Sequence, residues 1–157
     1  MVEVDVLRRA LSECWAAEVS GVSYYEALSE RFPDHRQEFD ALALVEKTTR
    51  DLIEAVARKY EVSIDQSEAE RIGIEVAQSG NSWREVLENA LAYTPDTLRM
   101  YTNLADVLPE DESALGQAIV DHERAQIVLF ESAATGGTND WSAVDGFLDR
   151  YGAHRHS

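Results

Sequence analysis

The stretch "CWAAEVSGVSYYEAL", residues 14–28, decides the fold, because it predicts a helix whose apolar face contains a carboxylate. Steps of three and four residues place on one face Leu7, Leu11, Cys14, Glu18, Gly21, Tyr25, Leu28 and Phe32. All of these are apolar or small except Glu18, since Tyr25 adds only a hydroxyl group. An ionised carboxylate without a partner is costly to bury. Glu18 therefore needs a hydrogen-bond partner, a raised pKa or a metal ion.

The helix containing this stretch is expected to run from about Val4 to Arg31, because Pro33 cannot continue it. A second helix, from about Gln37 to Lys59, repeats the same anomaly. Its expected core face consists of Phe39, Leu42, Glu46, Thr49, Ile53, Val56 and Tyr60. A glutamate followed one turn later by a threonine interrupts this apolar face. Matched polar positions on two helices favour a common purpose over chance.

A long connection follows, and it is expected to contain a short acidic helix over residues 65–78 that Gly80 ends. The run Ser82-Trp83-Arg84-Glu85 is typical of a capping box, so a third long helix begins near Trp83. Thr94-Pro95 should kink or break this helix before it continues to Pro109.

A fourth long helix is expected to follow the acidic turn 110–112 and to reach about Ala134. Its stretch "LGQAIVDHERAQIVLFE", residues 115–131, has two overlapping apolar stripes, one through His122 and Gln126 and one through Glu123. The sequence leaves open which stripe faces the core. A rotation that brings His122 inward is expected to turn Glu123 away.

The last helix is expected to cover one end of the bundle with Trp141, Val144, Phe147 and Tyr151. Because no strand pattern competes, the helices predict an all-α four-helix bundle with a long connection between the second and third long helices and a short C-terminal helix. We expect residues 1–152 to form a single domain. Residues 153–157, which include His154 and His156, are expected to be a disordered tail.

The composition restricts the partners and the compartment. The 157 residues include 30 acidic and 14 basic side chains, a formal net charge of −16, which disfavours binding to nucleic acid or to anionic membranes. The single cysteine, Cys14, cannot form an internal disulfide and is expected to be a small buried hydrophobe. No signal peptide or membrane-length apolar run is evident, so a cytoplasmic protein is expected. A homodimer is compatible with apolar helix flanks, although no heptads define an interface.

These residues carry a resemblance to the rubrerythrin-like members of the ferritin-like superfamily. The stretches "AAEVSGVSYYEALSERFPD" and "FDALALVEKTT" resemble the first half of that superfamily's carboxylate site, and "MYTNLADVLPED" and "LGQAIVDHERAQ" resemble the second half. The resemblance implies a ferritin-like bundle with two bound metal ions, usually iron. In such sites the first and third long helices each supply a glutamate, and the second and fourth each supply Glu-x-x-His.

This chain keeps only part of that ligand set. By the resemblance, Glu18, Glu46 and Glu123 match three of the glutamates. Thr49 and Gln126 replace both histidines, and Thr94 replaces the fourth glutamate, so the sequence predicts a degenerate site that does not hold two irons.

Our leading hypothesis is a metal-free enzyme or small-molecule binder that needs no cofactor. Clustered carboxyl groups cannot all ionise cheaply, so at least one should have a raised pKa, which suits acid–base catalysis by an isomerase, dehydratase or cyclase. The expected acid–base groups are Glu18, Glu46, Glu123 and His122. The expected substrate contacts are Tyr25, Thr49, Thr94, Tyr101 and Gln126.

Two alternatives remain open. The first is a carboxylate-bridged oxidoreductase or oxygenase in which Glu18, Glu46 and Glu123, helped by His122 or Gln126, hold a single Fe or Mn ion. The second is a structural bundle without a site. Its glutamates would accept hydrogen bonds from Tyr24, Tyr25, Thr49 or Tyr101.

Overall fold

The computed structural model describes residues 3–136 and 138–152, and these residues form helices without any strand. The helices are α1 (Val4–Arg31), α2 (Arg36–Lys59), α3 (Gln66–Val76), α4 (Trp83–Val107), α5 (Ser113–Ala134) and α6 (Ser142–Tyr151). Two 3₁₀ turns, η1 (Pro33–His35) and η2 (Glu110–Glu112), precede α2 and α5. The predicted all-α class is confirmed. The predicted tail, with His154 and His156, lies outside the described residues.

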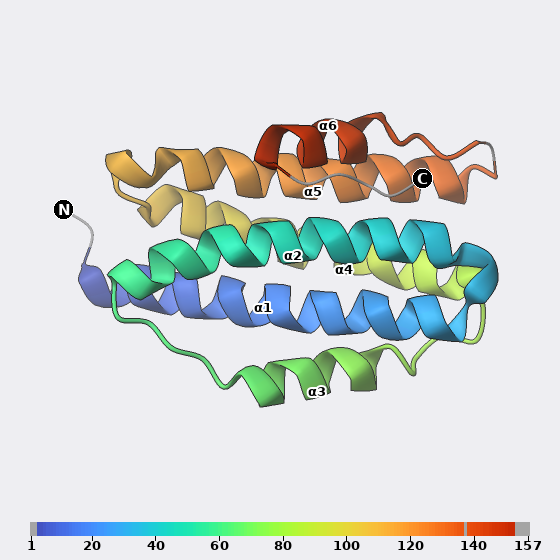
Figure 1. Ribbon diagram of the computed structural model, residues 1–157, viewed down its shortest axis with the longest axis horizontal. Coiled ribbons are helices and arrows are strands. Elements are labelled where there is room, and N and C mark those ends of the chain that lie inside the picture. The colour runs from blue at the N-terminus through green and yellow to red at the C-terminus, as the bar shows by residue number, and fades with distance from the viewer. Residues whose placement is uncertain (1–2, 137, 153–157) are drawn as a thin grey trace.

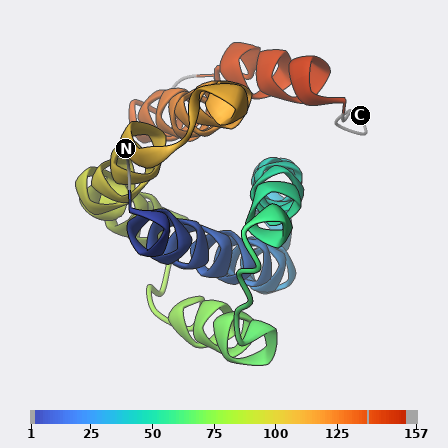
Figure 2. The same ribbon diagram turned by 90° about the vertical axis from the view of Figure 1, so that its left-hand side faces the viewer.

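The four long helices α1, α2, α4 and α5 enclose a common interior, as the end-on view in Figure 2 shows. α1 contacts α2 and α4, and α5 contacts the same two helices from the other side. α2 and α4 run in the same direction, because the connection that contains α3 travels back along the bundle (Figure 1). α3 lies outside α1, and α6 lies against α5 and α2. The predicted long connection is therefore confirmed.

The start of α4 confirms one half of the predicted capping box. The backbone N–H of Glu85 donates to Ser82 Oγ at 3.2 Å. The Glu85 carboxylate accepts from the Asn81 N–H at 2.6 Å, one residue before the position that a standard box uses.

Of the two outcomes predicted at Thr94-Pro95, the break does not occur, since α4 continues through Pro95, and the kink stays a prediction. Proline removes one helical N–H donor, but Pro95 is exposed, so water can bond the carbonyl group that loses its partner. The adjacent Thr94 hydroxyl donates to the Ala90 carbonyl group at 3.1 Å, which keeps this side chain against its own helix.

A polar layer divides the hydrophobic interior into two clusters. One cluster contains Leu28, Phe39 and Leu129, and the other contains Leu11, Ile53 and Ile119. Between these levels of α1, α2 and α5 lie the buried side chains Glu18, Glu46, Thr49, His122 and Glu123. The expected apolar faces are thus confirmed, together with their polar interruptions.

Cys14 is buried, as predicted for a small hydrophobe. Burial, assisted by the nearby Glu13 carboxylate, raises the pKa of its thiol to about 12. The thiol is therefore poorly suited to act as a nucleophile.

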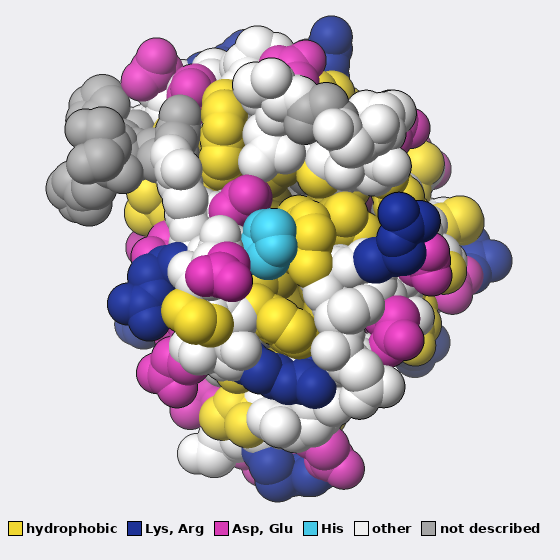
Figure 3. Space-filling view, turned by 90° about the vertical axis from the view of Figure 1, so that its right-hand side faces the viewer, with side chains coloured by type: hydrophobic (Ala, Val, Ile, Leu, Met, Phe, Trp, Pro, Cys, Tyr) yellow, Lys and Arg dark blue, Asp and Glu magenta, His cyan; other side chains and the backbone are white. Residues whose placement is uncertain are grey.

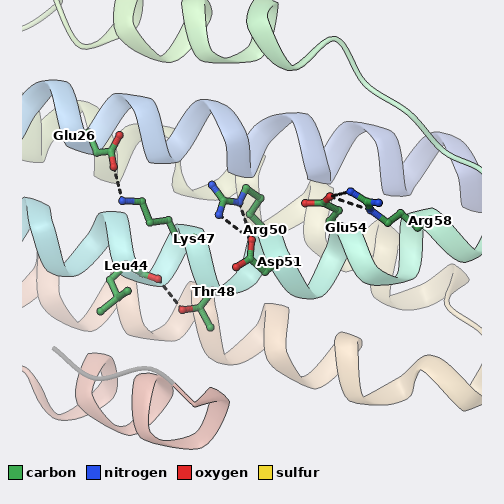
Figure 4. Close-up of polar contacts among 8 residues, drawn as sticks. All are labelled: Glu26, Leu44, Lys47, Thr48, Arg50, Asp51, Glu54 and Arg58. Atoms are coloured by element: carbon green, nitrogen blue, oxygen red, sulfur yellow. Dashed lines mark hydrogen bonds and ion pairs between the residues drawn. The ribbon is translucent and has the colours of Figure 1, made fainter.

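Three basic side chains of α2 pair with carboxylates, as Figure 4 shows. One of these contacts joins α2 to α1, and the other two lie within α2. The pairs are Lys47–Glu26, Arg50–Asp51 and Arg58–Glu54. These basic groups therefore add little net positive charge to the acidic surface.

The end of the bundle near η1 is closed by stacked aromatic rings. The His35 ring stacks on Trp83 with centroids 4.3 Å apart, and Trp83 meets Phe39 edge-on at 5.2 Å. Figure 3 views this end and shows a histidine among hydrophobic side chains, with acidic and basic groups interspersed around them. Among the described helices, none combines the length and the apolar character needed to cross a membrane.

Gly73 allows α3 to approach α1 closely. A Cβ atom on Gly73 would lie 2.1 Å from the backbone oxygen of Ser20, and this backbone atom cannot move alone. We therefore expect Gly73→Ala to separate α3 from α1 while leaving the four long helices folded. Hydrogen exchange should show protection lost in residues 66–76 and retained in the long helices.

Gly146→Ala is the matched control, since no atom lies within 4 Å of the added methyl group on α6. This change should be neutral or stabilise the fold by about 0.5–1 kcal/mol, because glycine is a poor helix former. Unchanged protection of α3 in Gly73→Ala would contradict the close docking.

Candidate functional site

Glu18 lies at the centre of α1 and is 0 % exposed. Neither carboxyl oxygen has a hydrogen-bond partner in the described residues, so the predicted tyrosine or threonine donors do not hold it. His122 Nδ1 lies 3.7 Å from Glu18 Oε2. Burial first, and then the neighbouring carboxyl group of Glu46, raise the pKa of Glu18 well above its ordinary value. Glu18 is therefore suited to hold a proton at neutral pH.

Glu46 approaches Glu18 from α2. Its Oε1 atom accepts a hydrogen bond from the amide of Gln126 and lies 3.4 Å from His122 Nε2. A Cβ atom on Gly21 of α1 would lie 2.2 Å from Glu46 Oε2, so the missing side chain provides the space for this carboxyl group. The sequence placed Gly21 on the core face but assigned it no role. Its position one turn after Glu18 is the sequence feature that could have indicated this role.

The His122 ring is held from both sides. Its Nδ1 atom lies 2.7 Å from the Thr49 hydroxyl oxygen, and its Nε2 atom lies 3.0 Å from the amide nitrogen of Gln126. Thr49 and Gln126 thus fix the orientation of the imidazole, which leaves both ring nitrogens near carboxyl groups.

His122 and Glu123 are both buried, so the expectation that only one of them could face the interior is wrong. The reason is that α5 contacts α2, α4 and α6, which together cover two adjacent faces of the helix. A helix in a two-sided groove can bury neighbouring residues without rotating.

Three of these side chains lie close enough to share a metal ion. Glu18, Glu46 and His122 each offer one ligand atom, and the three atoms lie within 4.8 Å of one another. All three side chains are buried. Glu123, which was predicted to complete the carboxylate set, lies outside this group.

Glu123 is 3 % exposed, and its Oε1 atom has no hydrogen-bond partner in the described residues. Burial raises the pKa of Glu123 to about 7, His122 opposes this shift, and Glu46 adds to it. Glu123 is therefore a second buried carboxyl group that can gain or lose a proton near neutral pH.

A cavity of about 400 Å³ leads to this cluster between α1, α3, α4 and α5. Its wall contains four members of the polar layer and its surroundings, namely Glu46, His122, Glu123 and Gln126. Of the other predicted substrate contacts, Tyr25, Thr94 and Tyr101 also line it. Glu18 and Thr49 are absent from the wall, so they act on a bound molecule only through their neighbours.

No family profile, curated protein or solved structure matches the chain. The likeness to ferritin-like proteins therefore remains a resemblance of residues and helix pattern. What the structure itself provides is an all-helical bundle with a buried Glu–His group close enough to bind a metal.

Glu123→Gln should change the pH dependence of stability. Because the pKa of Glu123 is raised on folding, the native state binds more protons than the unfolded chain, and stability is lost as pH rises from about 4.5 to about 7. The free energy of unfolding of the variant should exceed that of the natural protein by about 1–2 kcal/mol at pH 8 and by little at pH 4. Water in the pocket makes this difference smaller than the full pKa shift of Glu123 would give.

Urea unfolding at the two pH values measures this difference. Glu131→Gln is the control, because Glu131 is exposed on the same helix and should give equal stability changes at both. An equal gain for Glu123→Gln at both pH values would contradict the raised pKa.

Proposed function

We propose that the chain is a ferritin-like bundle whose cavity binds a small organic molecule and moves protons on it through Glu18, Glu46 and His122. The observation that carries the proposal is the Glu18–Glu46 pair: Glu18 has no hydrogen-bond donor, while Glu46 lines an open cavity. The parallel α2 and α4, joined by one long crossover, support the ferritin-like assignment.

The arrangement suits general acid–base catalysis. Glu46 lies in the cavity wall, where it can take a proton from a ligand and return it at another position. Glu18 lies behind it as a proton reservoir. His122 is oriented by Thr49 with its Nε2 atom 3.4 Å from Glu46 Oε1, where a protonated imidazole stabilises the ionised carboxylate. Proton movement without net oxidation matches the isomerase, dehydratase or cyclase chemistry expected from the sequence.

A two-metal centre of the type that the resemblance implies does not fit these residues. Thr49 and Gln126 occupy the expected imidazole positions, and Thr94 donates its hydroxyl hydrogen to its own helix. Within the described residues a single three-ligand group forms, with one histidine and two glutamates. Ligand number and charge are too small for two divalent ions.

A single Fe or Mn ion is the second candidate, favoured by the spacing of Glu18, Glu46 and His122. The two unpartnered oxygens of Glu18 would gain a cation as partner, and Thr49 would orient the imidazole. Such an ion, when bound, supplies Lewis-acid or redox chemistry next to the cavity.

Anaerobic iron titration should therefore show at most one equivalent bound per chain. The physical reason is that one imidazole and two carboxylates can hold one ion but offer too few ligand atoms and too little negative charge for two. Two equivalents per chain, with the near-ultraviolet absorption of an oxo-bridged iron pair after exposure to air, would contradict this expectation and restore the oxidase hypothesis.

Hydrogen–deuterium exchange into ligands tests the proposed function. Protein freed of metal by a chelator is incubated in deuterium oxide with a panel of small carbonyl and hydroxy compounds, each with and without an amino group. Mass spectrometry should find deuterium in at least one compound with the natural protein and with Glu131→Gln, but not with Glu46→Gln. Exchange that appears only after iron or manganese is restored would favour the second candidate, and no exchange in any compound that binds would contradict proton transfer.

A further inference from the structure

The cavity wall contains several acidic groups, and its one basic side chain among the described residues is His122, whose two ring nitrogens already contact Thr49 and Gln126. Among the described residues that line it there is no lysine or arginine, whereas Glu46, Glu123 and Asp96 are present. Asp96 is exposed and already pairs with Arg99, so Glu46 and Glu123 are the carboxyl groups that act on a ligand. The basic side chains Lys47 and Arg50 line a separate groove between α1, α2 and α3, and each already pairs with a carboxylate.

One carboxyl oxygen of Glu123 has no hydrogen-bond donor, and a ligand in the cavity could supply one. Its Oε1 atom is buried and has no partner, although the residue lines the cavity. Glu46, by contrast, already accepts from Gln126. A group that brings several N–H donors and a positive charge would satisfy Glu123 and lie beside Glu46, and an ammonium group has three such donors.

Aromatic rings surround the same space. Tyr24 and Tyr25 meet edge-on at 5.0 Å, and Tyr93 and Tyr101 of α4 contribute two further rings to the wall. Tyrosine faces attract cations and also pack against apolar groups. The volume of about 400 Å³ fits a compact molecule with one ring rather than a long chain.

We propose that the ligand is an organic cation, with a primary or secondary ammonium group on a compact apolar or aromatic body. The ammonium group lies against Glu123 and Glu46, and the body lies among the tyrosines. Carboxylates and phosphates are disfavoured, because the described wall residues include no lysine or arginine, both ring nitrogens of His122 already have partners, and the chain as a whole carries a charge of −16. This inference rests on the cavity being the ligand site proposed above.

Three matched probes test the charge preference: 2-phenylethylamine, 2-phenylethanol and 3-phenylpropionate, which are cationic, neutral and anionic at pH 7. Each is titrated into chelator-treated, ¹⁵N-labelled protein, and the backbone amide signals of Gly21, Ala90 and Gln126 report binding in the cavity. The amine should bind about tenfold or more tightly than the alcohol, and the anion should not bind.

Two variants test whether Glu123 causes the preference for the amine over the alcohol. Glu123→Gln should weaken amine binding about tenfold and leave alcohol binding unchanged, whereas Glu131→Gln, which removes the same charge from the exposed face of α5, should change neither. The amide spectra of both variants check that they are folded.

The remaining outcomes separate the two proposals. Alcohol or anion binding as tight as amine binding would overturn the cation inference while the cavity stands as a ligand site. Amine shifts confined to residues outside the cavity would also overturn it. No binding of any probe at millimolar concentration would overturn both this inference and the ligand site on which it rests.

Discussion

Glu18→Leu should make the protein more stable at neutral pH by about 1–4 kcal/mol and raise its melting temperature by several degrees. The reason is that Glu18 is 0 % exposed, lacks hydrogen-bond partners and lies on a face that is otherwise apolar. Leucine has a similar size and contacts the same neighbours without the cost of a buried carboxyl group. The same change should abolish deuterium exchange into ligands, because Glu46 loses its proton reservoir.

Glu13→Leu is the matched control for Glu18→Leu. Glu13 is exposed on the same helix, so its replacement should change stability by less than about 0.5 kcal/mol and leave exchange intact. A sharp fall in the melting temperature of metal-free Glu18→Leu would mean that Glu18 anchors the fold, and the structural alternative would then replace the functional one.

Gly21→Ala should have the second large effect, because its methyl group would take the place of the Glu46 carboxyl group. The added carbon would lie 2.2 Å from Glu46 Oε2 and 2.6 Å from its carboxyl carbon. Glu46 must then leave its hydrogen bond with Gln126, which we expect to cost about 1–3 kcal/mol and to reduce ligand exchange to background.

A double-mutant cycle isolates this contact. Combined with Glu46→Ala, the methyl group on residue 21 meets no carboxyl group, so Gly21→Ala should cost at least about 1 kcal/mol less in that background. Gly146→Ala controls for the general effect of alanine on a helix. Full additivity of Gly21→Ala and Glu46→Ala would contradict the direct contact.

The helices could be predicted from the sequence because their signals are local. Apolar spacing, Pro33 and the Ser82–Glu85 capping box define α1, α2 and α4 to within a residue or two. The burial of Glu18 and Glu46 also followed from spacing alone, since each lies on a helix face whose other members are mostly apolar.

The details of the cluster depend on contacts between helices, which spacing does not reveal. The burial of both His122 and Glu123 depends on α5 being covered on two sides. The role of Gly21 depends on the approach of a side chain from α2, and that of Gly73 on the approach of α3. The continuity of α4 through Pro95 depends on which side of the helix faces solvent. Apart from the position of Gly21 one turn after Glu18, none of these features has a signature in a single stretch of residues.

The central claim is that the buried carboxyl cluster of the metal-free protein holds a proton on Glu18 at neutral pH. Carbon-13 NMR of protein labelled at the glutamate carboxyl carbons measures this directly, with Glu18→Gln used to assign the signal. The account predicts that the Glu18 carboxyl group stays protonated at pH 7 and that Glu123 titrates near pH 7. A Glu18 signal that titrates near the ordinary value of 4.5 would contradict it.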